Sequence, residues 1–329
     1  MRIFAYEHIT GGGMMGQRDI AALALEGELM LRALVQDLVA LAEVEVVIMR
    51  DPRVTLDLPV AQHVPQSAEE LWPTFRRVAR GVDAVWPIAP EQAGILERAS
   101  REVVEAERTL LGSRPEAVRT TSSKLRTAVL LAAAGVSTIP TFANEESVPN
   151  GVHQIVVKPD DGAGCQDTRL FPDRAELRRW LQQHRRAGWV FQPFLHGEAL
   201  SLCVLCWDQR ARLLACNRQR VSIRDGRFEF SGVSVNAVAD RDQRYARLAS
   251  AVVHALPGLW GYVGIDVIDT AGGPVVVEVN PRLTTSYAGL HQALGVNPAK
   301  LVLELPESLD EPFAPVRTHA VEVAVAHGS

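Results

Sequence analysis

VVVEVNPR, residues 275–282, is the stretch of the sequence that says most about the fold. Its four valines predict a buried strand, and a strand turns alternate side chains to the same face. Glu278 and Asn280 therefore point the same way, roughly 6 to 7 Å apart. Their carboxylate and amide oxygens are hard ligands of the kind that Mg²⁺ takes while it keeps waters and phosphate oxygens in its shell. The stretch thus predicts a strand that carries part of a magnesium site.

The residues before this stretch supply a third oxygen ligand. Residues 261–282, GYVGIDVIDTAGGPVVVEVNPR, alternate as the two strands of a hairpin. A three-residue loop at 271–273 sets Asp266 directly opposite Glu278, whereas a four-residue loop misaligns the two side chains. An exposed polar face is the plain alternative, but the valines indicate burial, and a buried carboxylate needs a partner. We expect Asp266, Glu278 and Asn280 to bind Mg²⁺ or Mn²⁺.

A second segment has the features of a phosphate loop. IVVKPDDGAGCQDTR, residues 155–169, places a lysine near the end of a strand and glycines in the loop that follows. Gly162 and Gly164 have no Cβ, so backbone amides can approach phosphate oxygens while Lys158 offsets their charge. The loop is not a Walker motif, because GxxxxGK followed by Ser or Thr is absent. Taken alone, Lys158 is also compatible with a solvated lysine before a turn.

Two further segments have the chemistry to bind other parts of a nucleotide. Lys124 begins a helix after TSS at 121–123, where free backbone amides and the helix dipole favour an anion. A surface lysine is the alternative. FQPFLHGEALS, residues 191–201, is an apolar segment whose backbone can bond an adenine edge while Phe194 packs nearby and Glu198 reaches a ribose. By itself this segment is equally compatible with a core strand.

In chain order these pieces are a helix lysine, a strand lysine with a glycine loop, an apolar linker with a glutamate, and an aspartate followed by Glu-x-Asn on a hairpin. This order resembles the ATP-grasp superfamily over about residues 105–300. The resemblance implies ATP held between two α+β lobes. It places Lys124 and Lys158 on phosphates, Gln192 to Leu195 along the adenine, and Asp266, Glu278 and Asn280 on magnesium.

Arg282 lies on the same strand face as the expected metal ligands, two residues after the last of them. Under the resemblance it lies near the γ-phosphate and the acyl phosphate, where developing charge needs a fixed cation. Arg282 and Lys158 are therefore the expected catalytic residues. Many relatives have a Glu where Gln192 stands and a G-x-E spacing, whereas Glu198 directly follows Gly197 here, which leaves the ribose contact open. The expected ATP-binding residues are Lys124, Lys158, Gly162, Gly164, Gln192, Phe194, Leu195 and Glu198.

The first hundred residues have the pattern of an open parallel α/β unit. Short apolar runs predict strands at 2–7, 44–49 and 84–88, and apolar residues at helical spacing predict helices at about 19–42 and 91–108. Strands that alternate with helices in this way are typical of a parallel sheet.

The later sequence is mostly antiparallel in pattern, with a helix at 123–134, a strand at 153–158, strand-like runs from 190 to 282, and a final strand at 320–326. With the resemblance, these elements imply an α/β protein of α+β lobes, in which an ATP-grasp fold follows a Rossmann-like pre-ATP-grasp domain. The expected domains are residues 1–108 for the N-terminal parallel domain, 109–190 for the small lobe, and 191–329 for the large lobe with the magnesium-binding hairpin.

Within the superfamily, four short strings resemble the tyramine-glutamate ligase branch of methanofuran and methylofuran biosynthesis. They are ITGGG at 9–13, EGELMLRALVQDL at 26–38, IAPEQAGIL at 88–96 and NRQR at 217–220. The resemblance implies a ligase that uses Mg-ATP to activate a carboxylate as an acyl phosphate and joins it to an amine. The implied substrates are glutamate and tyramine or tyrosine.

Several residues are expected to face these substrates. The N-terminal loop TGGGMMGQ, residues 10–17, is expected to cover the acyl-phosphate site, and Glu7 or Glu91 is expected to receive an ammonium group. Arg218 and Arg220, on one strand face, are expected to hold phosphate or a substrate carboxylate. The expected substrate-facing residues are Gly11, Gly12, Gly13, Glu91, Arg218 and Thr284.

Composition favours small-molecule partners. The 329 residues are 47% hydrophobic, enough for a substantial core, and the net charge of -5 gives no broad basic surface for nucleic acid or an anionic membrane. The N-terminus lacks the apolar core of a signal peptide, and no run reaches the roughly 18 apolar residues of a membrane-spanning helix. We expect a cytoplasmic protein without a nucleic-acid or membrane partner, and a homodimer is compatible with the sequence.

The four cysteines are too few for a disulfide scaffold and are expected to be free thiols. Cys203 and Cys206 mimic a CxxC motif, but they lie in a strand-like run where positions three apart face opposite sides of the sheet. Buried thiols are therefore favoured over a metal site.

Two other functions compete with the ligase. Gly11, Gly13 and Gly16 spell GxGxxG after the first strand, the fingerprint of an NAD(P)-dependent oxidoreductase. However, the second strand ends near Arg50 and Asp51, about 35 residues past the glycines rather than the roughly 20 expected for the ribose-binding acid. A non-catalytic nucleotide-binding module is the third interpretation, but three metal ligands beside an arginine are what turnover requires.

Overall fold

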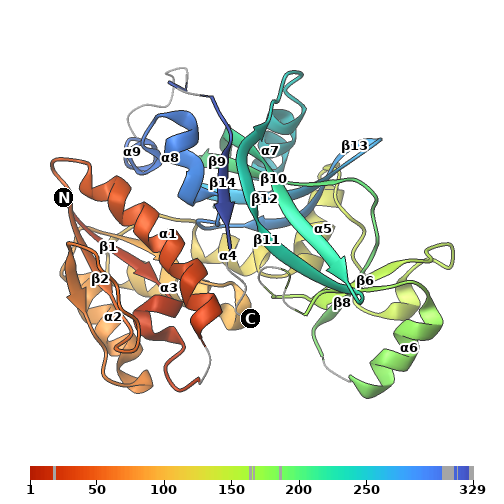
Figure 1. The fold of residues 1–329 in the computed structure, drawn as a ribbon, viewed down its shortest axis with the longest axis horizontal. Coiled ribbons are helices and arrows are strands. Elements are labelled where there is room, and N and C mark those ends of the chain that lie inside the picture. Colours follow the sequence, from red (N-terminus) through yellow and green to blue (C-terminus); the bar gives the residue numbers. More distant parts are fainter. Residues whose placement is uncertain are drawn as a thin grey trace.

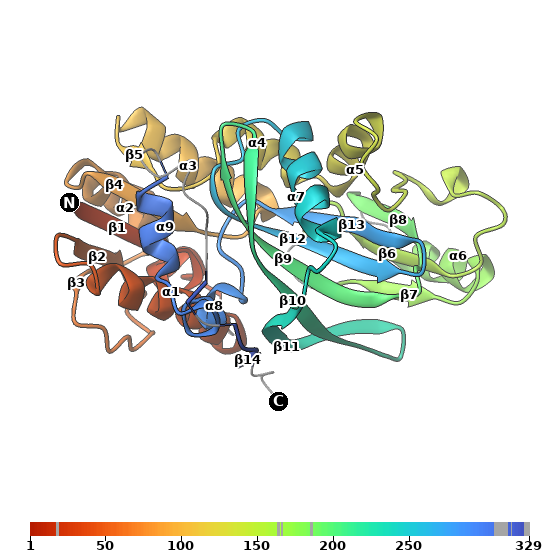
Figure 2. The same ribbon diagram turned by 90° about the horizontal axis from the view of Figure 1, so that it is seen from above.

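The computed structural model describes residues 1–17, 20–162, 165, 167–184, 187–305, 315–316 and 318–325. An N-terminal α/β unit lies beside a larger antiparallel sheet, and β6 and β8 with α6 lie at the far end from it (Figure 1). Turned by 90°, the chain extends from the N-terminal sheet at one end to α6 at the other (Figure 2). No helix among the described residues has both the length and the apolar composition to cross a bilayer.

The N-terminal unit is a five-stranded sheet in the order β3-β2-β1-β4-β5, with every neighbouring pair parallel. Alternate residues of its central strands enter two different cores, one under α1 and the other under α2 and α3. Helices thus cover both faces, as a parallel sheet requires. The strands are β1 (Arg2–Glu7), β2 (Glu45–Met49), β3 (Ala61–His63), β4 (Ala84–Ile88) and β5 (Thr109–Leu110), and the helices are α1 (Ala21–Val39), α2 (Leu71–Arg80) and α3 (Ile95–Glu105).

The second sheet runs in the order β13-β12-β9-β10-β11-β7-β6-β8, with β14 paired to β11, and its ladders are antiparallel. Its strands are β6 (Ile155–Pro159), β7 (Arg169–Phe171), β8 (Trp189–Pro193), β9 (Glu198–Trp207), β10 (Arg210–Arg224), β11 (Arg227–Val238), β12 (Gly261–Thr270), β13 (Gly273–Asn280) and β14 (Val321–Ala324). The antiparallel pattern expected of the later sequence is confirmed.

The remaining helices connect or cover these sheets. They are α4 (Pro115–Thr121), α5 (Lys124–Ala133), α6 (Arg174–Gln183), α7 (Arg244–Ala255), α8 (Tyr287–Leu294) and α9 (Pro298–Leu303). Four short turns also occur: a π-helical turn η1 (Ile9–Gly13) and the 3₁₀ turns η2 (Ala68–Glu70), η3 (Gln92–Gly94) and η4 (Glu145–Ser147).

Most expected elements lie within a few residues of their observed bounds. The strands expected at 2–7 and 84–88 coincide with β1 and β4. The helix expected at 91–108 divides instead into η3 and α3, because Ala93 and Gly94 adopt positive φ angles of 53° and 68°. Most of the coil expected after Leu305 lies outside the described residues.

The hairpin of β12 and β13 differs from expectation in one respect. Its loop has two residues rather than three, because Thr270 pairs with Gly273. A bulge between the Asp266 and Val267 positions then restores the register by one residue, so that Asp266 still pairs with Glu278. The loop prediction was wrong, and the predicted pairing is nevertheless confirmed.

The N-terminal unit is tied to the second sheet through α1 and α8. One continuous core contains side chains of β1, α1, α8, α9, β9 and β11. At its edge the Tyr287 hydroxyl donates to Asp37 Oδ2 at 2.8 Å, and His291 Nδ1 lies 2.5 Å from Asp37 Oδ1. This contact fixes α1 against the chain that follows β13.

Candidate active site

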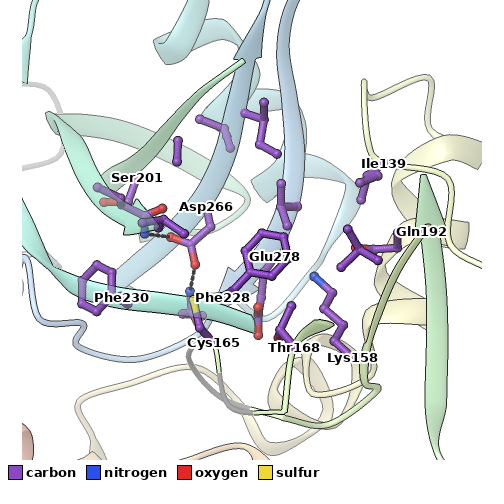
Figure 3. Close-up of a pocket in the computed structure, with 18 of the residues that line it drawn as sticks. Ile139, Lys158, Cys165, Thr168, Gln192, Ser201, Phe228, Phe230, Asp266 and Glu278 are labelled. Carbon is purple, nitrogen blue, oxygen red and sulfur yellow. Dashed lines mark hydrogen bonds between the residues drawn. The ribbon is translucent and has the colours of Figure 1, made fainter. Parts of the chain in front are cut away.

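One pocket, here called the central pocket, collects most of the residues singled out in the sequence. Its walls come from β6, β8, β9, β10, β11, β12 and β13, the chain after β13, and α1. Asp266 and Glu278 enter from one side and Lys158 from the other (Figure 3). The expected site residues that line it are Lys158, Gln192, Phe194, Leu195, Asp266, Glu278, Asn280, Arg282 and Thr284.

Asp266, Glu278 and Asn280 meet as the strand pattern predicted. Asp266 pairs with Glu278 across the hairpin, and Asn280 Nδ2 donates to Asp266 Oδ2 at 3.1 Å. Gln219 Nε2 donates to the other carboxylate oxygen of Asp266 at 3.0 Å. Burial raises the pKa of Asp266 to about 7, and the neighbouring charge of Glu278 adds to the shift.

The chemistry of this donor set fits a hard divalent cation. Lys124 Nζ lies 3.1 Å from Glu278 Oε1, so an ammonium group already pairs with one of the two carboxylates. The raised pKa of Asp266 means that its charge is not fully compensated, and a bound divalent ion would compensate it. Among the described residues no three His, Cys, Asp or Glu side chains could hold a metal, so the Asn280 amide is needed to complete the set.

Lysine is rare in this chain, and two of its three lysines lie at this site. The other basic residues are arginines, which form planar, bidentate contacts, whereas lysine presents a compact point charge. Lys158 is 7% exposed, and burial lowers its pKa to about 8, with Glu278 opposing the shift. Lys124 Nζ donates to Gly162 O at 2.5 Å.

The amides at the start of α5, expected to be free for an anion, are instead occupied. Asp160 O accepts from Lys124 N at 3.1 Å, and Asp160 Oδ1 accepts from Leu125 N at 2.8 Å. Ser123 Oγ accepts from Arg126 N at 3.1 Å and caps the helix. A tertiary partner from the glycine loop thus replaces the expected anion at this helix end.

The glycine loop after β6 is only partly described. Gly162 lies against the ring of Pro159, where an added Cβ would come within 3.1 Å of the proline Cβ. Its carbonyl holds Lys124 rather than lining the central pocket. Gly164 lies outside the described residues.

The apolar linker contributes one wall of the central pocket. Gln192, Phe194 and Leu195 line it together with Ile139 and other apolar side chains. The Gln192 side chain is 1% exposed, and its Nε2 donates to Thr141 Oγ1 at 2.9 Å.

Glu198 and Arg218 do not line the pocket; they form an ion pair with each other on the exposed part of β9 and β10. Arg220 likewise pairs with Glu322 of β14. Gln219, between the two arginines, faces the opposite side of the strand and reaches Asp266. The structure therefore places neither arginine where it was expected. The face of β10 that carries Gln219 meets the site, and the arginines lie on the opposite face.

Arg282 is fixed by a residue of the N-terminal unit. Its Nε and Nη2 donate to the two carboxylate oxygens of Glu91, both at 2.9 Å, and the two side chains are 12% and 6% exposed. Glu91 is therefore engaged by Arg282 rather than available for an ammonium. Thr284 lines the central pocket, and its Oγ1 lies 3.0 Å from the Tyr262 hydroxyl.

The glycines of η1 lie outside the walls of the central pocket and are explained by packing. A Cβ on Gly11 would come within 3.0 Å of the Tyr6 ring, and one on Gly13 within 2.1 Å of the His8 ring. Gly12 has a φ of 103°, which favours glycine. The GxGxxG spacing thus has a structural cause in this loop.

Several residues that line the central pocket were not predicted from the sequence. Phe228 and Phe230 of β11, Ser201 of β9 and Glu26 of α1 all contribute to it. For Gln219, alternation beside the two arginines was a usable signal. Glu26 begins the string at 26–38, but that string did not indicate a place in the pocket, because α1 meets the pocket only through the tertiary fold.

The two CxxC-like cysteines behave as expected. Cys203 packs in the core shared with α1 and α8, whereas Cys206 packs in the core under α7. Both are fully buried free thiols, and burial raises the pKa of Cys203 to about 11.

The fold and pocket together describe an α/β protein in which lysines and hairpin carboxylates face one another beside an apolar wall. A family model described as an ATP-grasp domain matches residues 121–286, and one described as a pre ATP-grasp 3 domain matches residues 44–118. The chain therefore belongs to the ATP-grasp family.

Similar proteins include ligases. The chain is 28% identical to tyramine–L-glutamate ligase of Methanocaldococcus jannaschii over 212 residues, which are 64% of this chain and 59% of that protein. It is 27% identical to a probable alpha-L-glutamate ligase of Stenotrophomonas maltophilia over 220 residues, 62% of this chain and 72% of that protein. The chain thus spans about six tenths of the length of the tyramine–glutamate ligases it matches.

Solved structures share the fold. A putative ATP-grasp superfamily protein from Archaeoglobus fulgidus superimposes with a TM-score of 0.73 at 21% identity, over 100% of both chains. An L-amino acid ligase from Bacillus licheniformis gives a TM-score of 0.67 at 19% identity, over 92% of this chain and 73% of that one.

Proposed function

We propose that this chain is an ATP-dependent carboxylate–amine ligase that forms an amide bond through an acyl phosphate. The observation that carries the proposal is the convergence of Lys158, Arg282 and the oxygen donors of β12 and β13 on one pocket with an apolar wall at 192–195. The family assignment and the names of its relatives support it.

In the proposed reaction the chain's residues bind and orient the reactants. Lys158 binds phosphate oxygens, and Lys124 does the same after leaving Glu278. Asp266, Glu278 and the Asn280 amide would hold Mg²⁺, which when bound supplies positive charge to the phosphate oxygens.

Arg282 then stabilises negative charge on the transferred group, since Glu91 holds its guanidinium in place. A substrate carboxylate oxygen attacks the γ-phosphorus in line, and ADP leaves with the electrons of the broken P–O bond. The uncharged amine nitrogen next attacks the acyl carbon, inorganic phosphate leaves with the electrons of the broken C–O bond, and the nitrogen loses a proton. No protein nucleophile is required.

The finer proposal names the substrates as L-glutamate and either tyramine or tyrosine, in methylofuran-type cofactor biosynthesis. It rests on the sequence resemblance and on the names of similar proteins. The domain bounds 1–108, 109–190 and 191–329, the cytoplasmic location and a homodimer belong to the same proposal.

The proposal is tested by a screen for ADP release with Mg-ATP, L-glutamate and a panel of amines headed by tyramine and tyrosine. We expect Lys158→Ala and Glu278→Ala to abolish ADP release while the far-UV circular dichroism spectrum is retained. Lys300→Ala is the matched control, because Lys300 lies on α9 with a half-exposed side chain away from the central pocket. Near-normal turnover in either pocket variant would refute the site.

A binding measurement separates the ligase from the competing functions. Thermal stabilisation of the wild type is compared at equal concentrations of Mg-ATP, NAD(H) and NADP(H). A shift specific to the nicotinamide nucleotides would favour the oxidoreductase. Stabilisation by Mg-ATP without ADP release for any acid and amine would favour a non-catalytic nucleotide-binding module.

A further inference from the structure

A ligase of this kind must bind an amine that carries a positive charge in neutral solution, and the two acids first considered for it are engaged elsewhere. Glu7 accepts hydrogen bonds from Ile9 N at 3.0 Å and from Thr10 N and Oγ1, both at 2.7 Å. Glu91 accepts hydrogen bonds from Nε and Nη2 of Arg282. Neither carboxylate lines the central pocket.

Glu26 is a carboxylate of the N-terminal unit that does line it. The residue lies on α1, and its Oε1 accepts a hydrogen bond from Thr285 Oγ1 at 2.6 Å. Within the described part of the chain, no Lys, Arg or His lies within ion-pair distance of it. A half-buried carboxylate with acceptor capacity remaining is a site for a cation from solution.

The surroundings of Glu26 suit a primary ammonium better than a metal ion. Arg282 lines the same pocket, but it donates to Glu91 and makes no ion pair with Glu26, so its charge acts on Glu26 only at longer range. The nearby hydroxyls of Thr285 and Ser286 are neutral acceptors that can share the protons of an ammonium. A single carboxylate is too few hard ligands for a divalent cation.

The position of Glu26 is also well fixed. The next residue is Gly27, where an added Cβ would come within 2.5 Å of the Glu7 carboxylate, so α1 packs directly on the end of β1. Farther along the helix, Asp37 accepts from the Tyr287 hydroxyl. These contacts hold Glu26 against the chain after β13, which is where Arg282 enters the pocket.

We propose that Glu26 binds the protonated primary amine of the amine substrate and then accepts one of its protons, which frees the nitrogen lone pair for attack. Glu26 thereby selects amines that carry a positive charge in neutral solution. This inference rests on the proposed ligase function. It assigns the N-terminal unit a direct part in recognising the amine, whereas the nucleotide and the metal are held by the other sheet.

The test uses Glu26→Gln, which keeps the shape of the side chain and removes its charge. Wild type and variant are compared with Mg-ATP and L-glutamate against two nucleophiles: tyramine, which carries an ammonium, and hydroxylamine, which is uncharged at neutral pH. We expect kcat/KM for tyramine to fall about 10- to 100-fold, the range expected for loss of one charge-assisted hydrogen bond. Hydroxamate formation and the KM for ATP should change less than about twofold, because neither depends on the ammonium.

Two further variants sharpen the comparison. Glu28→Gln removes the same charge two residues along α1, where Glu28 pairs with Arg32 instead of lining the pocket, and should leave the tyramine reaction unchanged. Glu26→Asp keeps the charge on a shorter side chain and should retain more tyramine activity than Glu26→Gln. Equal losses for tyramine and hydroxylamine in Glu26→Gln would overturn the inference.

Calorimetric titration of tyramine into the protein with Mg-ADP provides a readout that does not depend on turnover. Weaker tyramine binding in Glu26→Gln than in the wild type supports the inference, whether or not any acid supports ADP release. The absence of ADP release with every acid would refute the ligase function alone. Equal tyramine affinity in the two proteins, with ADP release intact in the wild type, refutes the role of Glu26 and leaves the ligase function standing.

Discussion

The pair of Arg282 and Glu91 offers the sharpest test of how the two units support the site. Both side chains are nearly buried, at 12% and 6% exposure, and two hydrogen bonds of 2.9 Å join them. Breaking a buried ion pair by removing one partner costs about 3–5 kcal/mol, because the other charge stays buried without compensation. Arg282 keeps a hydrogen bond to Leu283 O in Glu91→Leu, so the lower end, about 3 kcal/mol, is expected for that variant.

The assay is a double-mutant cycle. The free energy of urea unfolding is measured for wild type, Glu91→Leu, Arg282→Met and the double variant. Each single change leaves one buried charge without its partner, whereas the double change replaces both charged side chains with apolar ones of similar volume. The double variant should therefore be more stable than either single variant, although it should release no ADP.

The control pair is Arg224 and Glu229 at the exposed tip of the β10–β11 hairpin, with side chains 76% and 40% exposed. Glu229→Leu should cost at most about 1 kcal/mol, as for most surface pairs. If the costs of Glu91→Leu and Arg282→Met simply add in the double variant, the two residues do not stabilise each other and the argument for a fixed Arg282 fails.

Three further outcomes follow from the charges of the central pocket. Burial lowers the pKa of Lys158 to about 8, so kcat/KM for ATP should fall as the pH rises through that value. An active Lys158→Arg variant should lose this decline, and a wild-type kcat/KM that does not change with pH would contradict the role of Lys158. Asp266 has a pKa of about 7 when folded and about 4 when unfolded. Without metal, the free energy of unfolding should therefore decrease as the pH rises from about 4 to about 7, and Asp266→Asn should reduce this slope as measured by urea unfolding. Glu278→Gln leaves the buried Lys124 without its carboxylate and should weaken the stabilisation that Mg²⁺ gives in the presence of ADP; an unchanged thermal shift would argue against the donor set.

Local periodicity was sufficient to predict the hairpin acids. Alternation along β13 places Glu278 and Asn280 on one face whatever else the chain does, because that rule depends only on the strand itself. The pairing with Asp266 required more, since it depends on loop length and on any bulge. The expected three-residue loop and the observed two-residue loop with a bulge give the same pairing, so the residues were predicted correctly from an incorrect loop.

Predictions that depended on which tertiary partner a side chain meets fared worse. The start of α5 looked like an anion site because its amides were unassigned in the sequence, yet Asp160, from the loop after β6, occupies them. Arg218 looked available for a substrate, yet Glu198 on the neighbouring strand pairs with it. Neither partner can be deduced from spacing within one element, because each contact joins two elements and depends on how they pair or pack.

The charges of the central pocket suggest why ATP and a metal would enter together. Asp266 and Glu278 repel a polyphosphate, while Lys124 is held by Glu278 and so cannot yet serve the nucleotide. A divalent cation held by the two carboxylates would offset this repulsion, and Lys124 would then be free to leave its ion pair with Glu278 for the phosphates. Under the proposed function, the same residues would couple metal binding to nucleotide binding. Lys158 makes no ion pair with Asp266 or Glu278 in the described part of the chain, so it would be available to the phosphates before the metal binds.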